Sequence, residues 1–436
     1  MMSSIVQDAI AAKAASRLLA VLDSATKNDA LHRMACALEE SFDVLLSLNC
    51  EDVHEAREQS ISPSALVRME LTREKLQQIA VGLRTMAALE DPVGKVLLRS
   101  ELDDGLELQK ITSPFGVIAA IVEARPDAVT QLCALALKSG NALMIKAGTE
   151  IGRTTRAILA AFAKALQSTQ IPPHAFTNVE GREAIREILA LQDYVDLVVP
   201  RGSSDLVRFV SANTRIAVIG HSDGVCHIYV ESSANREMAI SLILDAKTQA
   251  PATCNAVETV LVDQGIANEF LPIAFQSLRW HGVKVRGCAA TRTICGADVE
   301  LVKGTEWHTE YGDLTLAIRV VPGVDAAIAH IETFGSHHTD CIVTEDAQAA
   351  SQFLRRVDSA GVFHNVSTRF ADGYRYGLGA EVGIATGKLH ARGPVGVEGL
   401  VTYKYVLSGS GHCVGQYAGA NARRFKHELV ESAVSE

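Results

Sequence analysis

The segment GVIAAIV (residues 116–122) opens a series of short apolar stretches that decides the fold of this 436-residue chain. The series continues with NALMIKA (141–147), VDLVVP (195–200) and RIAVIG (215–220), and stretches with helical spacing lie between them. Apolar runs of strand length that alternate with helices are typical of parallel strands buried on both faces of a sheet. The series therefore predicts a doubly wound α/β lobe.

A second alternating series predicts a second lobe of the same kind. Its apolar stretches are CHIYVE (226–231), ETVLVD (258–263), LTLAIRVV (314–321), DCIVTED (340–346) and GVFHNV (361–366). Helical spacing dominates before residue 90, and the alternating stretch VTYKYVLSG near the end predicts an exposed strand that can pair with another subunit. We therefore divide the chain into a nucleotide-binding lobe (1–225), a catalytic lobe (226–390) and a return segment with an oligomerisation strand (391–436).

Composition and charge exclude several classes of function. The net charge is -10, and no cluster of Lys and Arg is interleaved with aromatic residues, so nucleic acid is not an expected partner. No apolar run approaches the roughly 20 residues that span a bilayer, and the first residues mix acids and bases in a helical pattern. We expect a cytoplasmic protein without a membrane partner, with a mitochondrial presequence as the alternative.

The nine cysteines are scattered and form neither CxxC nor a Cys/His group with zinc spacing. The sequence therefore predicts no disulfide framework and no metal site. Cys254 differs from the rest because it lies in a polar loop, within AKTQAPATCNAVET (246–259), between a predicted helix and a predicted strand. Backbone N–H groups in such a loop can activate a thiol and bind an oxyanion. A structural or merely exposed thiol is the alternative.

Two further segments have the character of cofactor sites. In PRGSSDLVRF (200–209), Gly202 closes a turn after a strand, and Ser203 and Ser204 can cap a helix whose free N–H groups face an anion. A plain helix cap explains the same letters equally well. In SGNALMIKAGTE (139–150), a strand ends at Lys146 and Gly148, where a lysine can contact a ribose or a 2′-phosphate and so favour NADP over NAD. A solvated lysine is the alternative.

Long strings of this sequence resemble the aldehyde dehydrogenase family and, within it, the γ-glutamyl phosphate reductases (glutamate-5-semialdehyde dehydrogenases). The resemblance spans about residues 10–410 and rests on SPFGVIAAIVEARPDAVTQLCALALKSGNAL, DLVVPRGSSDLV, GHSDGVCHIYVE, CNAVETVLV, TEYGDLTLAIRVV, GSHHTDCIVTEDAQAA and HNVSTRFADGYRYGLGAEVGIATGKLHARGPVGVEGL. The variants GHSDGVCH, ARPDA and PATCNAVET look most like the reductase half of Δ1-pyrroline-5-carboxylate synthetases. The resemblance implies two doubly wound parallel-sheet lobes and a small β-flap for oligomerisation, built from a segment near residues 100–113 and the C-terminal strand.

The resemblance also implies a role for particular residues. Cys254 matches the nucleophile, Asn255 is a candidate oxyanion donor, and Glu310 matches the acid at the nicotinamide ribose. The remaining residues it points to form two groups, for the cofactor (Lys146, Gly148, Arg201, Gly202, Ser203 and Ser204) and for the carboxylate and phosphate of the substrate (Arg125, Ser367, Thr368, Arg369 and Arg392).

Two departures from the family pattern bear on the chemistry. The segment EARPD lacks the Asn that helps to bind the oxyanion in many members, which leaves the N–H of Cys254 and the side chain of Asn255 for that task. Hydrolytic members carry a Glu about 34 positions before the nucleophile, where this chain has Gly220. A missing base for water suits an intermediate that is resolved by hydride or phosphate.

The function implied is reduction of L-glutamyl 5-phosphate to L-glutamate 5-semialdehyde through a thioester on Cys254, for proline biosynthesis. NADPH is the expected cofactor, with NADH as the alternative, and the expected partners are identical subunits in a dimer or tetramer and a separate glutamate 5-kinase. Two other functions stay open: a non-phosphorylating semialdehyde dehydrogenase, and a catalytically silent structural or binding subunit.

Overall fold

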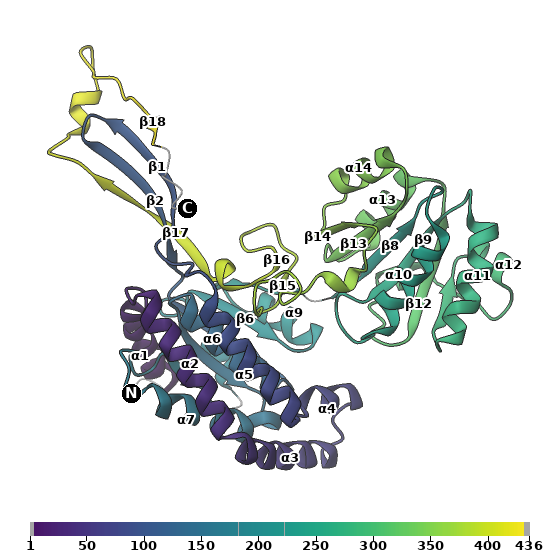
Figure 1. Cartoon of the computed structure of the whole chain (residues 1–436), viewed down its shortest axis with the longest axis horizontal. Helices are drawn as coiled ribbons and strands as arrows, with labels where there is room; N and C mark the ends of the chain where they lie inside the picture. Colours follow the sequence, from purple (N-terminus) through teal and green to yellow (C-terminus); the bar gives the residue numbers. More distant parts are fainter. Residues whose placement is uncertain (1–3, 182, 222, 431–436) are drawn as a thin grey trace. The chain divides into compact units, whose positions relative to one another are not determined.

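The computed structural model describes residues 4–181, 183–221 and 223–430, which form two compact units (Figure 1). Unit 1 contains the chain up to Val199, Asn213–Val218 and the chain from Gly396 onward. Unit 2 contains Pro200–Ala212 and Ile219–Val395. The predicted division into 1–225, 226–390 and 391–436 was drawn by function. It stays an interpretation, because the boundaries of the two units follow packing alone.

Unit 1 begins with five helices that carry apolar residues at helical spacing. In α2 this spacing buries Leu31, Met34 and Leu38 on one face, and the Asp23 carboxylate caps the helix by accepting a 2.7 Å hydrogen bond from the N–H of Thr26. The helices are α1 (Ser4–Leu19), α2 (Ser24–Glu40), α3 (Phe42–Glu58), α4 (Pro63–Met69) and α5 (Arg73–Ala88).

The first apolar series forms a five-stranded sheet in the order β5-β4-β3-β6-β7. The pairings β3–β4, β4–β5 and β6–β7 are parallel, and every residue of β3 is buried, as expected for a strand covered on both faces. The strands are β3 (Val117–Val122), β4 (Ala142–Ala147), β5 (Phe176–Asn178), β6 (Leu197–Arg201) and β7 (Ala217–Val218). Helices α6 (Pro126–Lys138), α7 (Gly152–Leu166) and α8 (Ala184–Leu189) connect them.

A separate antiparallel sheet in unit 1 forms the expected flap, in the order β17-β2-β1-β18. Its strands are β1 (Val96–Asp103), β2 (Leu106–Pro114), β17 (Val401–Ser408) and β18 (Glu428–Leu429), drawn as a long ribbon in Figure 1. β17 is an edge strand with largely exposed side chains. Its use in oligomerisation stays a prediction.

Unit 2 contains a seven-stranded sheet in the order β11-β10-β12-β9-β8-β13-β14, and each of its pairings is parallel. The central strands β8, β9 and β13 are buried along their whole lengths. The strands are β8 (Cys226–Val230), β9 (Val257–Asp263), β10 (Lys284–Gly287), β11 (Glu300–Leu301), β12 (Thr315–Val321), β13 (Thr339–Val343) and β14 (Gly361–His364).

Five helices connect these strands, and α9, which also belongs to unit 2, lies between β6 and β7 in the chain. Their bounds are α9 (Ser204–Ala212), α10 (Arg236–Thr248), α11 (Ala267–Trp280), α12 (Ala289–Cys295), α13 (Val324–Phe334) and α14 (Ala347–Arg356). A two-stranded ribbon of β15 (Ile384–Ala385) and β16 (Gly393–Pro394) follows. Within the described ranges, none of the helices has the length and apolar character needed to cross a membrane.

A buried ion pair joins α10 to β9 on either side of the Cys254 loop. Lys247 Nζ lies 2.8 Å from a carboxylate oxygen of Glu258, and both side chains are fully shielded from solvent. Burial raises the pKa of Glu258 to about 7, although Lys247 opposes the rise. Lys247 is therefore the cation that opposes protonation of Glu258, and each partner depends on the other.

Lys247→Met should destabilise unit 2 by about 3–5 kcal/mol, because it leaves a buried carboxylate without its cation. Removing Lys247 raises the pKa of Glu258 further, so the folded state keeps a proton that the unfolded state releases. Wild-type stability should stop falling near pH 7, whereas that of the variant should keep falling at higher pH. Both tryptophans, Trp280 and Trp307, lie in unit 2, so urea unfolding followed by tryptophan fluorescence measures this loss.

Lys284→Met is the matched control, since Lys284 pairs with Glu300 on the surface. It should change stability little. Equal stability of the two variants at pH 8 would contradict the assigned role of the buried pair.

Candidate active site

The candidate site lies where three neighbouring parallel strands of unit 2 begin. β8 lies between β9 and β13, with Cys226 opposite Val257 and His227 opposite Asp340. The segments that lead into these strands therefore converge at the amino ends of the strands. They carry Gly224 before β8, Cys254 before β9 and His338 before β13.

Cys254 is presented by a short turn between α10 and β9. The N–H of Ala256 donates to the carbonyl of Thr253 over 2.9 Å, and the Thr253 hydroxyl donates to the carbonyl of Ala250 over 2.7 Å. The Cys254 side chain is partly exposed, whereas Cys133, Cys226 and Cys341 are buried. Burial raises the pKa of Cys341 to about 12, so that thiol is inert at neutral pH.

One other partly exposed thiol is a rival for reactivity. Burial opposes ionisation of Cys288, but hydrogen bonds from Thr291 and Val320 outweigh it, and the pKa of the thiol is lowered. Cys288 precedes α12 at the opposite, carboxyl end of β10. The two candidate thiols therefore lie at opposite strand ends of the same sheet: Cys254 at the amino ends and Cys288 at the carboxyl ends.

Gly224 fixes the backbone of Cys254 by direct contact. A Cβ atom at position 224 would lie 2.1 Å from the Cys254 carbonyl oxygen and 2.6 Å from its Cα atom. The N–H of Gly224 donates to a carboxylate oxygen of Glu310 over 2.9 Å. Glu310 is thus linked to the Cys254 loop through one glycine, and its role at the nicotinamide ribose stays a prediction.

A second set of contacts holds the loop from the side of η3 (Thr368–Phe370). The Thr368 hydroxyl donates to the carbonyl of Asn255 over 2.8 Å, and the Asn255 amide donates to the carbonyl of Ala371 over 2.8 Å. Arg369 donates to the Thr253 hydroxyl over 2.8 Å and to the Gln249 side chain over 2.9 Å. Asn255 is buried in this network, and its use as an oxyanion donor stays a prediction.

Ser367 and Arg392 also lie in unit 2, in structural contacts of their own. The Ser367 hydroxyl accepts a hydrogen bond from the N–H of Arg369 over 3.3 Å. Arg392 donates to the Asp358 carboxylate over 2.9 Å and to the Asp358 carbonyl over 3.0 Å. Among the described residues, Arg369 and not Arg392 is hydrogen-bonded to the Cys254 loop, and contact with substrate stays a prediction for both.

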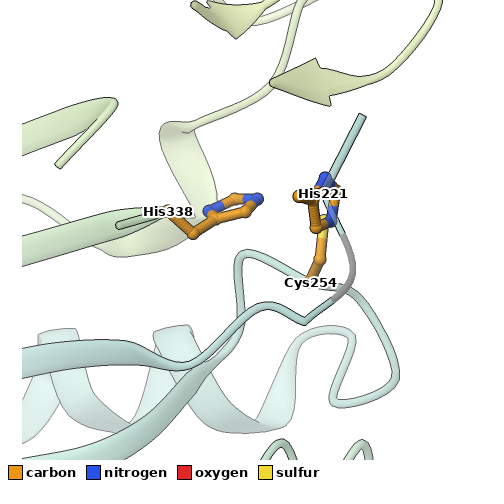
Figure 2. A group of neighbouring side chains, drawn as sticks. All are labelled: His221, Cys254 and His338. Atoms are coloured by element: carbon orange, nitrogen blue, oxygen red, sulfur yellow. The ribbon is translucent and has the colours of Figure 1, made fainter. Parts of the chain in front are cut away.

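Two histidines that the structure places beside Cys254 were not predicted from the sequence. His221, Cys254 and His338 each offer a ligand atom, and these atoms all lie within 4.8 Å of one another. Figure 2 shows the His338 ring pointing toward His221, which stands next to Cys254. The residues are far apart in the sequence, so no spacing rule could have found them.

The environment of His221 combines burial with several charges. Burial lowers its pKa and Arg201 adds to that effect, whereas a hydrogen bond to the Ile384 carbonyl and the carboxylates of Glu310 and Glu381 oppose it. The Arg201 guanidinium also lies near Gly383, where a Cβ atom would be 3.2 Å from its nitrogen. The structure thus places Arg201 beside His221 and Glu381, and its predicted contact with the cofactor stays untested.

The Ser203–Ser204 segment begins α9 as the sequence predicted. The Ser203 hydroxyl accepts a 3.3 Å hydrogen bond from the N–H of Leu206, which is a helix cap. Gly202 is exposed just before this cap. Gly220, at the position where hydrolytic relatives carry a Glu, also lies in unit 2 and leaves no carboxylate there.

Lys146 lies in a cavity of unit 1 of about 300 Å³. It emerges at the carboxyl end of β4, and Gly148 follows it, as the sequence predicted. Burial lowers the pKa of Lys146, while Glu150 and Glu180 oppose the shift. Arg153 and Arg156 line the same cavity. Arg125 also lies in unit 1, directly before α6.

The comparisons with known proteins agree with one another. The model of a family described as the aldehyde dehydrogenase family matches residues 3–296. A γ-glutamyl phosphate reductase of Synechococcus elongatus is 50% identical over 417 residues, which cover 96% of each chain. The crystal structure of a γ-glutamyl phosphate reductase of Thermotoga maritima superposes with a TM-score of 0.91 at 39% identity, and covers 94% of this chain and 100% of its own.

A more distant neighbour shares the fold alone. It is an engineered glycolyl-CoA reductase with bound NADP+, 15% identical, with a TM-score of 0.65 over 93% of this chain and 97% of its own. The length and strength of the closer matches decide the assignment. This chain belongs to the aldehyde dehydrogenase family, within its group of γ-glutamyl phosphate reductases.

Proposed function

We propose that this chain reduces L-glutamyl 5-phosphate to L-glutamate 5-semialdehyde with NADPH, and that Cys254 is the nucleophile. The proposal rests chiefly on the position of one partly exposed thiol, Cys254, whose backbone is fixed by Gly224 just before β9. The chain that presents this thiol is 50% identical to a γ-glutamyl phosphate reductase. Covalent capture on sulfur divides one difficult step into two easier ones.

The first half of the reaction is acyl transfer to sulfur. The Cys254 thiolate forms a bond with the γ-carbonyl carbon, the bond from that carbon to the phosphate oxygen breaks, and phosphate leaves with the electron pair. Arg369, hydrogen-bonded to Thr253 next to the nucleophile, supplies a guanidinium suited to a phosphate or carboxylate oxygen. The N–H of Cys254 is a candidate donor to the developing oxyanion.

The second half releases the aldehyde. When bound, NADPH supplies a hydride to the thioester carbon, after which the carbon–sulfur bond breaks and the thiolate returns to Cys254. Water must be kept from the thioester, and Gly220 leaves no carboxylate at the position that activates water in hydrolytic relatives. The buried Glu258 is paired with Lys247, so it is not a substitute base.

The cavity at Lys146 fits the phosphate-bearing half of the cofactor. Lys146, Arg153 and Arg156 line a cavity of about 300 Å³, in which Arg153 is paired with Asp52 and Glu55 and Arg156 is paired with Glu180. Glu180 lines the same cavity and offers an acceptor for a ribose hydroxyl. Lys146 is the candidate cation for the additional 2′-phosphate, and this supports NADPH over NADH.

We also propose that the protein acts in the cytoplasm as a homodimer or homotetramer. The edge strand β17 exposes Tyr405 and Leu407, which a second flap can cover by strand pairing. A separate glutamate 5-kinase would supply the acyl phosphate.

Gly224→Ala should lower kcat by at least about 100-fold, because an added methyl group displaces the Cys254 backbone and small misplacements of a nucleophile cost this much. Gly304→Ala is the control, since no atom lies within 4 Å of a Cβ there. Steady-state kinetics of both purified variants, with circular dichroism to verify folding, make the comparison. Equal kcat values would show that this contact does not position the thiol.

Cys254→Ser should abolish turnover and leave NADPH binding unchanged, because the hydroxyl is a far weaker nucleophile than a thiolate. Cys288→Ser is the matched control and should keep activity. Cys288 is partly exposed, and hydrogen bonds lower the pKa of its thiol. Turnover and cofactor fluorescence titration are the two measurements. Retained turnover in Cys254→Ser would remove the assignment of the nucleophile.

In the oxidative direction, turnover with pyrroline-5-carboxylate should require inorganic phosphate or arsenate, because phosphate must release the acyl group from sulfur. Absorbance at the nicotinamide band, measured with NADP and NAD in separate assays, tests both this requirement and the cofactor preference. Equal rates without phosphate would indicate the non-phosphorylating dehydrogenase instead. No turnover under any condition would indicate a silent subunit.

A further inference from the structure

The three side chains His221, Cys254 and His338 have the composition of a transition-metal site. Two imidazoles and one thiolate are ligands that Zn²⁺ prefers, and a site with three protein ligands leaves the fourth position open. Their ligand atoms all lie within 4.8 Å of one another, and all three residues belong to unit 2. Tetrahedral zinc, with bonds of about 2.0–2.3 Å, needs ligand atoms roughly 3.5 Å apart. The two imidazole rings meet edge to face with centroids 4.9 Å apart, so the side chains must rotate to bind one ion.

The far ends of both imidazole rings are available for a ligand. His221 Nδ1 lies 2.6 Å from the Ile384 carbonyl, so Nδ1 carries the proton and Nε2 keeps its lone pair. His338 Nδ1 lies 2.9 Å from the Thr339 hydroxyl and 3.5 Å from Cys226 Sγ. A histidine that binds a metal typically holds its second ring nitrogen in such a contact, which fixes the tautomer and the ring orientation.

His338 supplies the observation that points to a ligand. Its side chain is fully buried, and its Nε2 atom has no hydrogen-bond partner among the residues that the structure describes. Figure 2 shows this end of the ring directed toward His221 and Cys254. A buried polar atom left without a partner is costly, so an occupant that accepts its lone pair would stabilise this arrangement.

The surrounding charges permit a divalent cation. The carboxylates of Glu310 and Glu381 act on His221 and oppose the effect of the Arg201 cation there. Arg369, held by Gln249 and Thr253, is a further cation near the site, because Cys254 interacts electrostatically with its guanidinium. Two acids thus face one cation around His221.

We propose that His221, Cys254 and His338 form a Zn²⁺ site that captures the thiolate of Cys254. On binding, a sulfur–zinc bond forms and the thiol proton is released to solvent, with no change in oxidation state. The metal then occupies the electron pair that would attack the acyl phosphate. Inhibition of turnover by Zn²⁺, reversed by a chelator, follows from this site together with the proposed function of Cys254.

Direct measurement of Zn²⁺ binding to the full chain tests the site. Competition with a chromophoric chelator should give one Zn²⁺ per chain in the wild type. His338→Asn and Cys254→Ser each remove a ligand of the ion. They should therefore weaken Zn²⁺ binding by more than the roughly tenfold loss that follows when a hydrogen-bond partner of a metal ligand is removed. His337→Asn is the matched control, because His337 is the exposed neighbour of His338 and its Nδ1–H donates to the Asp358 carbonyl instead.

Alkylation supplies a second readout that does not depend on turnover. Zn²⁺ should protect Cys254 from iodoacetamide, as measured by peptide mass spectrometry, and should leave Cys288 unprotected. His221→Asn repeats the test if His338→Asn does not fold. Wild-type affinity in both histidine variants, or no protection of Cys254 in the wild type, would overturn the site.

The binding and activity results separate the two proposals. Zn²⁺ that binds with the expected ligands and inhibits supports both. Zn²⁺ that binds and protects Cys254, yet leaves turnover unchanged, supports the metal site and contradicts Cys254 as the nucleophile.

Discussion

The contact between Gly224 and the Cys254 backbone is the constraint on which the candidate site depends. The two residues lead into neighbouring strands, and there is no room for a side chain between them, since a Cβ atom would lie 2.1 Å from the Cys254 carbonyl oxygen. The strand register and this close approach together determine where the thiol is presented. Glu310 accepts a hydrogen bond from the N–H of the same glycine, so an acid predicted to hold the cofactor is tied to the Cys254 backbone by one residue.

The buried groups around this contact make the arrangement rigid. Lys247 before the loop and Glu258 after it form an ion pair that is shielded from solvent. The Thr368 hydroxyl donates to the Asn255 carbonyl, and the Asn255 amide donates to the Ala371 carbonyl. A thiol fixed in this way loses little freedom on binding substrate, which is how positioning would contribute to the rate of the proposed reaction. The site is therefore built from strand ends and backbone contacts, with few flexible side chains.

Much of the fold followed from the sequence because the signals were local and long. Continuous apolar runs predicted the parallel strands of both sheets, and the structure and the family match confirm this α/β class. The loop position of Cys254 and the placement of Lys146 at a strand end were also readable, because each needs only its own neighbours in the sequence. The resemblance to γ-glutamyl phosphate reductases is confirmed by relatives that cover nearly the whole chain.

The convergence of His221, Cys254 and His338 could not be predicted in this way. It depends on strand order, since β8 must lie between β9 and β13 before the three segments meet. The sequence shows these residues only as isolated letters, and cysteine spacing suggested no metal site. The engagement of the Asn255 amide with the Ala371 carbonyl is a similar case, because the partner lies more than a hundred residues away.

The central claim, that the substrate is carried on Cys254, is tested most directly by trapping the acyl group. The enzyme is mixed with pyrroline-5-carboxylate and NADP without phosphate, quenched in acid and digested at low pH, and the peptides are analysed by mass spectrometry. The account predicts a glutamyl group on the peptide that contains Cys254. A glutamyl group on Cys288 or on any other residue, with Cys254 unmodified, would contradict it.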